Sequence, residues 1–212
     1  MIRFITFEGG DGTGKTTQIQ ALEGYLRDQK RACVVTREPG GTALGKLLRQ
    51  VLLEVGDSDI GAPTELFLYL ADRAQHVKEV ILPAIAAEKL VLCDRFTDST
   101  LAYQGYGRGL DLNWLRKLNE MAGAITPDLT FLFDCPVEIA LARTAQRRAQ
   151  VPTAHEEDRF EREKLAFHER VRQGFLELAS AHPRRFRIID ASGSVEQVAK
   201  QIRAIVDQEV VQ

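Results

Sequence analysis

The sequence has few cysteines, few histidines and almost no net charge, and each shortage excludes a class of protein. Its 28 Lys and Arg are balanced by 30 Asp and Glu, so the net charge of −2 argues against a basic nucleic-acid binder. The four histidines show no metal-ligand spacing. The three cysteines lie in or beside apolar runs, which favours buried, reduced thiols over a disulfide or metal role. No apolar run approaches the ~18 residues of a membrane span, and nothing resembles a signal peptide, so we expect a cytoplasmic protein that binds neither nucleic acid nor membrane.

Short apolar runs that are typical of buried strands alternate along the chain with longer segments of helical periodicity. The expected strands are 4–7, 33–36, 90–93, 129–133 and 187–189. The expected helices are 15–29, 43–55, 65–88, 97–105, 112–123, 137–148, 157–181 and 194–209. This alternation predicts an α/β fold in a single domain, residues 1–212, with a five-stranded parallel sheet and helices on both faces. Ligands of such sheets bind at the carboxyl ends of the strands.

A glycine-rich segment between the first expected strand and the first expected helix is the strongest motif in the chain. Residues 9–16 read Gly-Gly-Asp-Gly-Thr-Gly-Lys-Thr, a complete G-x-x-x-x-G-K-[ST] phosphate loop. The glycines let several backbone N–H groups turn toward one phosphate, and Lys15 adds positive charge over the outer phosphates. The hydroxyl of Thr16 can ligate Mg²⁺. We therefore predict a P-loop NTPase fold in which ATP is bound by Gly9, Gly10, Asp11, Gly12, Thr13, Gly14, Lys15, Thr16 and Thr17.

Four further segments carry charged and aromatic residues near the expected strand ends. They are Thr36–Thr42 (T-R-E-P-G-G-T), Glu65–Arg73 (E-L-F-L-Y-L-A-D-R), Asp94–Gln104 (D-R-F-T-D-S-T-L-A-Y-Q) and the arginine-rich stretch 143–159. Each alone has an ordinary structural explanation: a solvated loop charge, a core aromatic residue, a local ion pair or a charged helix face. Together, in a protein with a phosphate loop, they indicate an active site.

In this order, the motifs closely resemble those of the bacterial thymidylate kinases. The resemblance covers roughly residues 3 to 193, and its most specific parts are T-R-E-P-G-G-T and D-R-F-x-x-S-x-x-A-Y-Q. It implies phosphorylation of dTMP to dTDP by ATP, in the supply of dTTP, with Mg²⁺ as cofactor. It also implies a homodimer.

The residues themselves suit phosphoryl transfer between two phosphates. An acceptor phosphate has a second pKa of about 6, so it is largely ionised at neutral pH and needs no general base. The obstacle is repulsion between two anions, and catalysis should therefore rest on cations and positioning. We expect Lys15 to act on the donor side, and Arg37 and Arg95 to act on the acceptor side. Asp94, at the end of an apolar strand, is expected to hold Mg²⁺ through water, with Thr16 as the other metal ligand.

The resemblance also implies roles in the acceptor and adenine sites. Phe67 is expected to stack on thymine, Arg73 to bond a pyrimidine carbonyl, and Tyr103 to fill the space of a ribose 2′-hydroxyl. Asp11 is expected to accept from the 3′-hydroxyl of dTMP, and Arg143 to lie against adenine. The remaining acceptor-site residues are expected to be Glu38, Ser99, Thr100 and Gln104.

One position departs from part of the family. Some relatives carry arginine directly after the acidic residue of the phosphate loop, where this chain has Gly12. The missing charge then has to come from a mobile lid near 143–159, as in the bacterial type whose lid supplies the catalytic arginine. Arg147 and Arg148 are the candidates. Helix register does not fix which of the two supplies the catalytic cation, and Arg148 is our first choice.

Three other classes of phosphate-loop protein fit less well. A guanylate, shikimate or deoxynucleoside kinase is not expected to combine T-R-E-P-G-G-T with the A-Y-Q segment. A GTPase switch would carry N-K-x-D and D-x-x-G motifs, but N-K-x-D is missing and Asp94 is followed by Arg-Phe-Thr. A nucleic-acid motor or clamp loader would need a basic surface, greater length and a second domain.

Overall fold

The computed structural model of the chain describes residues 2–53, 60–150, 160 and 163–210. Five parallel strands form one sheet in the order β2-β3-β1-β4-β5. The strands are β1 Phe4–Gly9, β2 Cys33–Arg37, β3 Leu90–Asp94, β4 Leu129–Asp134 and β5 Phe186–Asp190. The expected five-stranded parallel sheet is confirmed, and each expected strand lies within an observed one.

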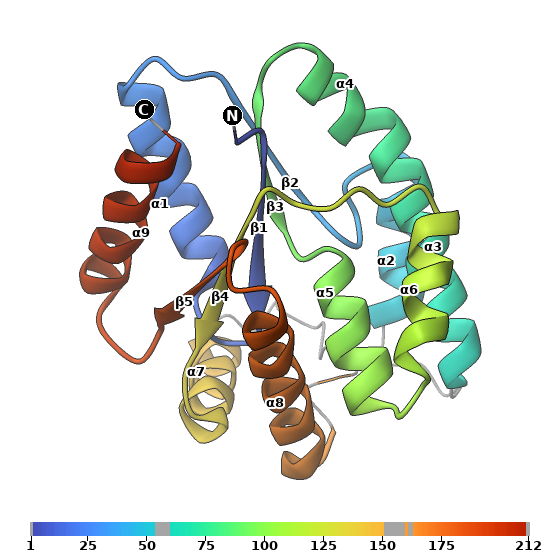
Figure 1. The fold of residues 1–212 in the computed structure, drawn as a ribbon. Helices are drawn as coiled ribbons and strands as arrows, with labels where there is room; N and C mark the ends of the chain where they lie inside the picture. Colours follow the sequence, from blue (N-terminus) through green and yellow to red (C-terminus); the bar gives the residue numbers. More distant parts are fainter. Residues whose placement is uncertain (1, 54–59, 151–159, 161–162, 211–212) are drawn as a thin grey trace.

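Helices connect the strands and cover the sheet (Figure 1). They are α1 Lys15–Asp28, α2 Ala43–Leu53, α3 Ala62–His76, α4 Leu82–Ala86, α5 Thr97–Thr100, α6 Leu112–Met121, α7 Val137–Gln150, α8 Leu165–Ala181 and α9 Val195–Glu209. Two π-helical segments, η1 Val77–Ile81 and η2 Leu101–Gly107, continue α3 into α4 and extend α5. A capping box of Ser194 and Gln197 begins α9.

Three of the expected helices differ from the observed ones. The helix expected over 97–105 consists of α5 and the π-helical η2. The helix expected over 65–88 consists of three joined segments, and it begins earlier because Pro63 is well suited to a first helical turn. The helix expected over 157–181 begins at Leu165, since Lys164 has an extended backbone with ψ of 151° and acts as the cap. Residues 157–159 and 161–162 of that expected helix, and residues 54–55 of the helix expected over 43–55, lie outside the described residues.

Different helices cover the two faces of the sheet (Figure 1). On one face, α1 and α9 pack together, and Phe7 and Phe131 join Leu22 and Ile202 in a buried core. On the other face, α4, α5 and α8 pack on the strands around residues such as Phe96. Helices on both faces are therefore confirmed. In the described parts of the chain, no helix is long and apolar enough to cross a membrane.

Candidate active site

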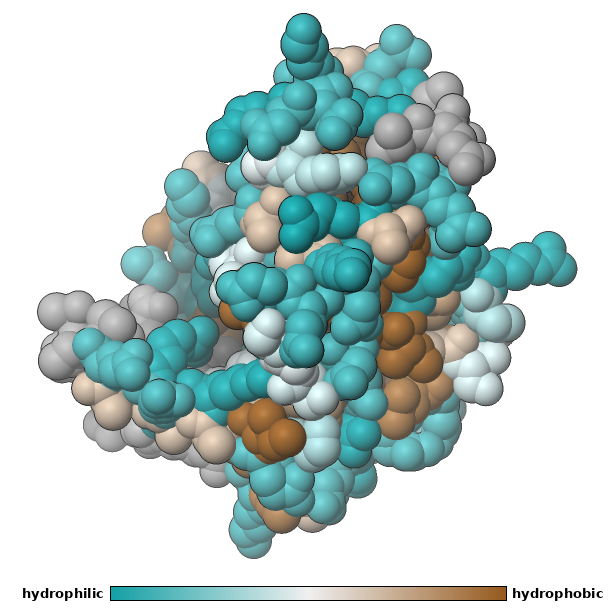
Figure 2. Space-filling view, turned by 90° about the vertical axis from the view of Figure 1, so that its left-hand side faces the viewer, coloured by the Kyte–Doolittle hydropathy of each residue, from teal (hydrophilic) through white to brown (hydrophobic). Residues whose placement is uncertain are grey.

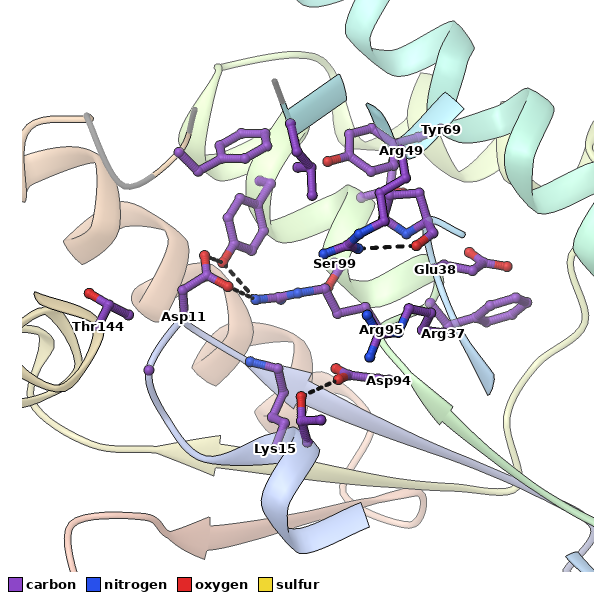
Figure 3. Close-up of a pocket in the computed structure, with 18 of the residues that line it drawn as sticks. Asp11, Lys15, Arg37, Glu38, Arg49, Tyr69, Asp94, Arg95, Ser99 and Thr144 are labelled. Carbon is purple, nitrogen blue, oxygen red and sulfur yellow. Dashed lines mark hydrogen bonds and ion pairs between the residues drawn. The ribbon is translucent and has the colours of Figure 1, made fainter. Parts of the chain in front are cut away.

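A cavity of about 750 Å³ opens at the carboxyl ends of β1, β2 and β3. In Figure 3, Lys15 and Asp94 lie toward the bottom of the view, Asp11 and Arg95 across its middle, and Tyr69 toward the top. Most of the expected site residues line this cavity, which brings together segments that are far apart in sequence. Those that line it are Asp11, Gly12, Gly14, Lys15, Thr16, Thr17, Arg37, Glu38, Arg73, Asp94, Arg95, Ser99, Thr100, Tyr103, Gln104, Arg143 and Arg147.

The phosphate loop has the backbone shape that its glycines predict. Gly12 and Gly14 adopt φ angles of 77° and 90°, which side-chain-bearing residues rarely adopt. A Cβ at position 12 would also lie 2.1 Å from the carbonyl oxygen of Ala140 in α7. In this arrangement, α7 excludes a side chain from position 12, which gives a physical reason why arginine is absent there. Three loop residues, Gly9, Gly10 and Thr13, line a smaller cavity behind the loop instead of the main one.

Lys15 begins α1, and its side chain folds back over the phosphate loop. Its Nζ donates to the carbonyl oxygens of Gly9 at 3.1 Å and Gly10 at 2.7 Å. Burial, together with the nearby guanidinium of Arg95, lowers the pKa of Lys15 to about 8. A phosphate in the loop would favour the charged ammonium, because an opposite charge at close range favours the ionised form. The loop is therefore suited to an anion.

Thr16 and Asp94 join the phosphate loop to the end of β3. Thr16 Oγ1 donates to Asp94 Oδ2 at 2.9 Å. Both are hard oxygen donors, which Mg²⁺ prefers. The described residues contain no group of three or more acidic, histidine or cysteine side chains that could hold a metal alone. Mg²⁺ in nucleotide sites does not need one, because phosphates and water complete its shell, so the pair fits the expected ion.

Arg95 occupies the middle of the cavity, between Lys15 and Tyr69 (Figure 3). Its Nη2 donates to Asp11 Oδ1 at 2.5 Å, and its Nη1 donates to Ser99 Oγ at 3.1 Å. Tyr103 donates its hydroxyl to Asp11 Oδ2 at 3.0 Å. Burial alone would raise the pKa of Asp11, but the Arg95 guanidinium holds it well below its usual range. Asp11 thus stays ionised and fixes both Arg95 and Tyr103.

A buried carboxyl group lies beneath this cluster. Glu8, fully buried in β1, accepts from the backbone N–H of Phe96 at 2.8 Å and from Ser99 Oγ at 2.6 Å. Burial, with a smaller contribution from the carboxylate of Asp98, raises the pKa of Glu8 to about 8. Glu8 was not among the expected site residues, because its contacts to the segment after β3 arise only in the folded chain.

The far end of the cavity is built on a buried ion pair. Arg73 Nε donates to Glu38 Oε2 at 2.8 Å, and both side chains are only 2% exposed. Arg73 Nη1 donates to Thr100 Oγ1 at 2.9 Å and also to Asn119. On the other side, Nδ1 of His76 lies 2.8 Å from Glu38 Oε1. These partners hold the Arg73 guanidinium in one orientation at the cavity wall.

The aromatic side chain at this end is Tyr69 and not Phe67. Tyr69 lines the cavity, whereas Phe67 lies outside it and is 54% exposed. A helix turns ~100° per residue, so Tyr69, four residues before Arg73, shares its face of α3 and Phe67 does not. Phe67 is therefore not positioned to stack on a base in this cavity, and we reassign the predicted stacking to Tyr69. The four-residue spacing to Arg73 is the signal that would have found Tyr69.

Helix α7 brings two arginines to the cavity. Arg143 donates from Nη1 to the carbonyl of Ala191 at 2.7 Å and from Nη2 to that of Ser192 at 3.0 Å, and so joins α7 to the loop after β5. Arg147 has an exposed side chain and lines the cavity. Arg148 is half-buried and does not line it, so the structure favours Arg147, the reverse of our first choice. Residues 151–159 of the expected lid lie outside the described residues.

Several cavity residues belong to no motif that the sequence displays. Arg49 on α2 donates to the carbonyl of Pro39 at 3.1 Å. Phe160 meets the ring of Tyr103 edge-on, with the ring centroids 5.2 Å apart. Only tertiary contacts bring these side chains to the site. Leu53 is a further cavity residue outside the motifs, whereas the unexpected residues Pro39, Phe96 and Thr144 lie within the segments 36–42, 94–104 and 143–159.

Comparison with known proteins gives a consistent result. The thymidylate kinase family matches residues 7–202. The thymidylate kinase of Desulfovibrio desulfuricans is 54% identical over 205 residues, which cover 96% of this chain and 94% of that protein. The thymidylate kinase of Geobacter sulfurreducens is 55% identical over 200 residues, which cover 94% of this chain and 93% of that protein. A crystal structure of thymidylate kinase from Ehrlichia chaffeensis matches with a TM-score of 0.77 at 32% identity, over 97% of this chain and 98% of that one. This neighbour confirms the expected P-loop NTPase fold. The chain belongs to the thymidylate kinase family.

Proposed function

We propose that this chain phosphorylates dTMP to dTDP with ATP as the co-substrate, the step that leads to dTTP for DNA synthesis. One observation carries the proposal: a single cavity has Lys15 of the phosphate loop at one end, Tyr69 and Arg73 at the other, and Arg95 between them. Such a cavity can hold a triphosphate and a nucleoside monophosphate with their phosphates facing each other.

The chemistry that these residues supply is charge neutralisation and alignment. The acceptor phosphate, with a second pKa of about 6, is already a nucleophile at neutral pH. Lys15 would hold the outer phosphates of the donor, and Arg95 would hold the acceptor phosphate. The ion pair between Arg95 and Asp11 fixes the guanidinium before a substrate arrives, so little reorganisation is needed in the transition state. Arg37, at the end of β2, adds a further cation on the acceptor side.

Mg²⁺ is the proposed cofactor, and the lid is the proposed source of the last cation. Thr16 and, through water, Asp94 would hold the metal, which when bound neutralises charge on the β- and γ-phosphates. Arg147 of α7 would reach the transferring phosphoryl group, and Arg143 would lie against adenine. The chain would then act as one nucleoside monophosphate kinase domain, with residues 143–159 as its lid.

Recognition of the acceptor is assigned to the far end of the cavity. Tyr69 would stack on thymine, and Arg73 would donate to a carbonyl of the base. Tyr103 would exclude a ribose 2′-hydroxyl, while Asp11 would accept from the 3′-hydroxyl. The side chains that would complete this part of the site are Glu38, Ser99, Thr100 and Gln104.

A homodimer is proposed from one exposed apolar surface. On α2, Leu44, Leu47 and Val51 are 44%, 61% and 53% exposed, and Phe67 on the adjoining α3 is exposed as well. The α2 positions recur at intervals of three and four, which makes one stripe along the helix. The face on the side of α1 and α9 is, by contrast, mainly hydrophilic (Figure 2). The α2–α3 stripe is the surface that a second copy would cover.

The cytoplasm is the proposed location. Cys33, Cys93 and Cys135 carry free thiols. Burial raises the pKa of the Cys93 thiol well above its ordinary value, which keeps it unreactive. Reduced, buried thiols suit a reducing compartment.

A panel of acceptors tests the activity. The purified chain is incubated with ATP and Mg²⁺ and with dTMP, dUMP, dCMP, dGMP, AMP or GMP, and ADP formation is followed by a coupled assay. We expect dTMP to be the best acceptor and dUMP to be weaker by about tenfold, because one methyl contact is lost in an apolar pocket. Faster turnover with AMP or GMP than with dTMP would refute the proposal. Shikimate as a further acceptor separates the alternative kinase class.

A further inference from the structure

A charged cluster behind the acceptor end joins three separate segments of the chain. Arg108, which follows η2, pairs through Nη1 with Glu163, and its Nη2 lies 3.4 Å from Glu65 Oε2. Glu65 is fully buried on α3, and its Oε1 accepts from Nε2 of Gln104 at 2.7 Å. Gln104 lines the cavity, whereas Arg108 and Glu65 do not. The ion pair therefore acts on the cavity only through its neighbours.

Arg108 also lies against the aromatic wall of the cavity. Its Cζ is 5.3 Å from the ring centroid of Phe160 and 4.8 Å from that of Phe167. Phe160 lines the cavity, is only 3% exposed and meets Tyr103 edge-on. A guanidinium over a ring face attracts the ring, so Arg108 restrains Phe160 although Arg108 itself does not line the cavity.

We propose that Arg108 and Glu65 are positioning residues that set the shape and polarity of the base end of the acceptor site. Glu65 orients the Gln104 amide, and Arg108 supplies the counter-charge for Glu65 while it holds Phe160 in place. The inference rests on the proposed function, since it takes the bound acceptor to be a pyrimidine nucleotide.

Glu65 decides which end of the Gln104 amide faces the base. Glu65 Oε1 accepts from Nε2 of Gln104, so the amide NH₂ of Gln104 faces Glu65. The amide oxygen is then the group that is left to accept from the base. Thymine and uracil carry a ring N3–H that can donate to this oxygen, and cytosine has no such hydrogen. The buried pair thereby favours pyrimidines with an N3–H.

Glu65→Gln tests the orientation of Gln104. The new amide at position 65 can either donate or accept, so Gln104 is free to turn over. The comparison uses dUMP and dCMP, which both lack the methyl group and differ only at the N3 and C4 edge. We expect the preference for dUMP over dCMP in kcat/KM to fall about tenfold, the effect of one hydrogen bond, with the KM for ATP unchanged. An unchanged preference together with an unchanged KM for dTMP would overturn the inference.

Arg108→Met tests the ion pair, with Arg170→Met as its matched control. Arg170 also lies over the Phe167 ring, at 5.9 Å, and donates to the carbonyl of Gly107 at 3.0 Å. We expect Arg108→Met to raise the KM for dTMP about tenfold with a smaller change in kcat, and Arg108→Lys to recover part of the loss. Arg170→Met should bind dTMP as the wild type does. Equal effects of both changes would mean that Arg108 only stabilises the aromatic cluster.

A double variant covers the case in which Arg108→Met does not fold because Glu65 is left buried without its counter-charge. Glu65→Gln with Arg108→Met removes both charges, and its Tm is measured by differential scanning fluorimetry. A folded double variant with a wild-type KM for dTMP and a wild-type preference for dUMP would overturn the inference. A wild-type enzyme that phosphorylates no pyrimidine nucleotide would instead overturn the proposed function, so the two failures are distinguishable.

Discussion

The donor end of the cavity is made mostly of backbone from one short segment, whereas the acceptor end is made of side chains from segments far apart in sequence. Nine consecutive residues, 9–17, form the loop and the start of α1, and Asp94, Arg143 and Arg147 join them from elsewhere. At the acceptor end, Arg73 of α3 meets Glu38 after β2 and Thr100 of α5. The two ends therefore depend on different parts of the fold.

This difference has an energetic consequence. Backbone amides are already held by the strand and helix on either side, so a side-chain change at the donor end alters the chemistry more than the fold. Buried charged side chains need their partners, since removing one leaves an uncompensated charge. We therefore expect donor-end variants to lose turnover and acceptor-end variants to lose stability as well.

Lys15→Ala should give the largest effect and should separate turnover from stability. We expect kcat to fall by about 10⁴-fold, because a cation on the transferring group is lost. The Tm should not fall by more than about 2 °C, since burial lowers the pKa of Lys15 to about 8 and its charge is a cost to the unliganded fold at pH 7. Steady-state kinetics and calorimetry measure both, with dTMP binding as the control. Near-normal turnover would contradict the donor-site assignment.

Arg147→Ala should give the second-largest effect, and Arg148→Ala, the adjacent residue on α7, is its control. An arginine that engages the transferring phosphoryl group is worth ~10³–10⁵ in kcat, and we expect a loss of about 10³-fold for Arg147. Arg148 does not line the cavity, so its removal should cost less than about tenfold. Both variants should keep the wild-type affinity for dTMP, because the cation acts mainly in the reacting complex. A larger loss for Arg148 would restore our first choice.

The difference between the two ends of the cavity, one local in sequence and one assembled from distant segments, also explains what could be predicted from the sequence. The strands and the phosphate loop are local patterns, so their positions were expected almost to the residue. Arg73 was expected because it lies in a recognisable segment, but its partner Asn119 on α6 carries no local signal. Phe67 is what the family resemblance implies, whereas the helical face that Arg73 shares points to Tyr69. Contacts between distant segments, such as Phe160 against Tyr103, depend on the packing of the whole chain.

Glu38→Ala should show how much the stability of the fold depends on the buried ion pair at the acceptor end. It leaves the guanidinium of Arg73 without its carboxylate, and we expect the free energy of unfolding to fall by about 3 kcal/mol. Asp94→Asn at the donor end is the control, because Asp94 is only partly buried and should change stability by less than about 1 kcal/mol. Urea denaturation measures both. Equal losses in the two variants would remove the distinction between the two ends.

Tyr69→Ala should affect the acceptor without affecting the donor. A base stacked on an aromatic side chain gains about 1–3 kcal/mol, so we expect the KM for dTMP to rise about tenfold while the KM for ATP stays unchanged. Phe67→Ala on the other face of α3 is the matched control for kinetics. It should leave both KM values unchanged and weaken the proposed dimer, which sedimentation at several concentrations would detect. If Phe67→Ala raised the KM for dTMP and Tyr69→Ala did not, Phe67 and not Tyr69 would be the stacking residue.

Glu8→Gln should give the smallest effect, because Glu8 supports the segment after β3 without lining the cavity. Its pKa is about 8 in the folded chain against about 4.5 when unfolded, so between these values the folded state binds more protons. The free energy of unfolding then falls as pH rises, with a limiting slope of about 1.4 kcal/mol per pH unit. Glutamine does not titrate and lacks this contribution. Urea denaturation at pH 6 and pH 7 should show the difference between variant and wild type shifting by about 1 kcal/mol in favour of the variant. A difference that stays constant over this range would mean that Glu8 is ionised in the folded chain and that the guanidinium of Arg95 outweighs its burial.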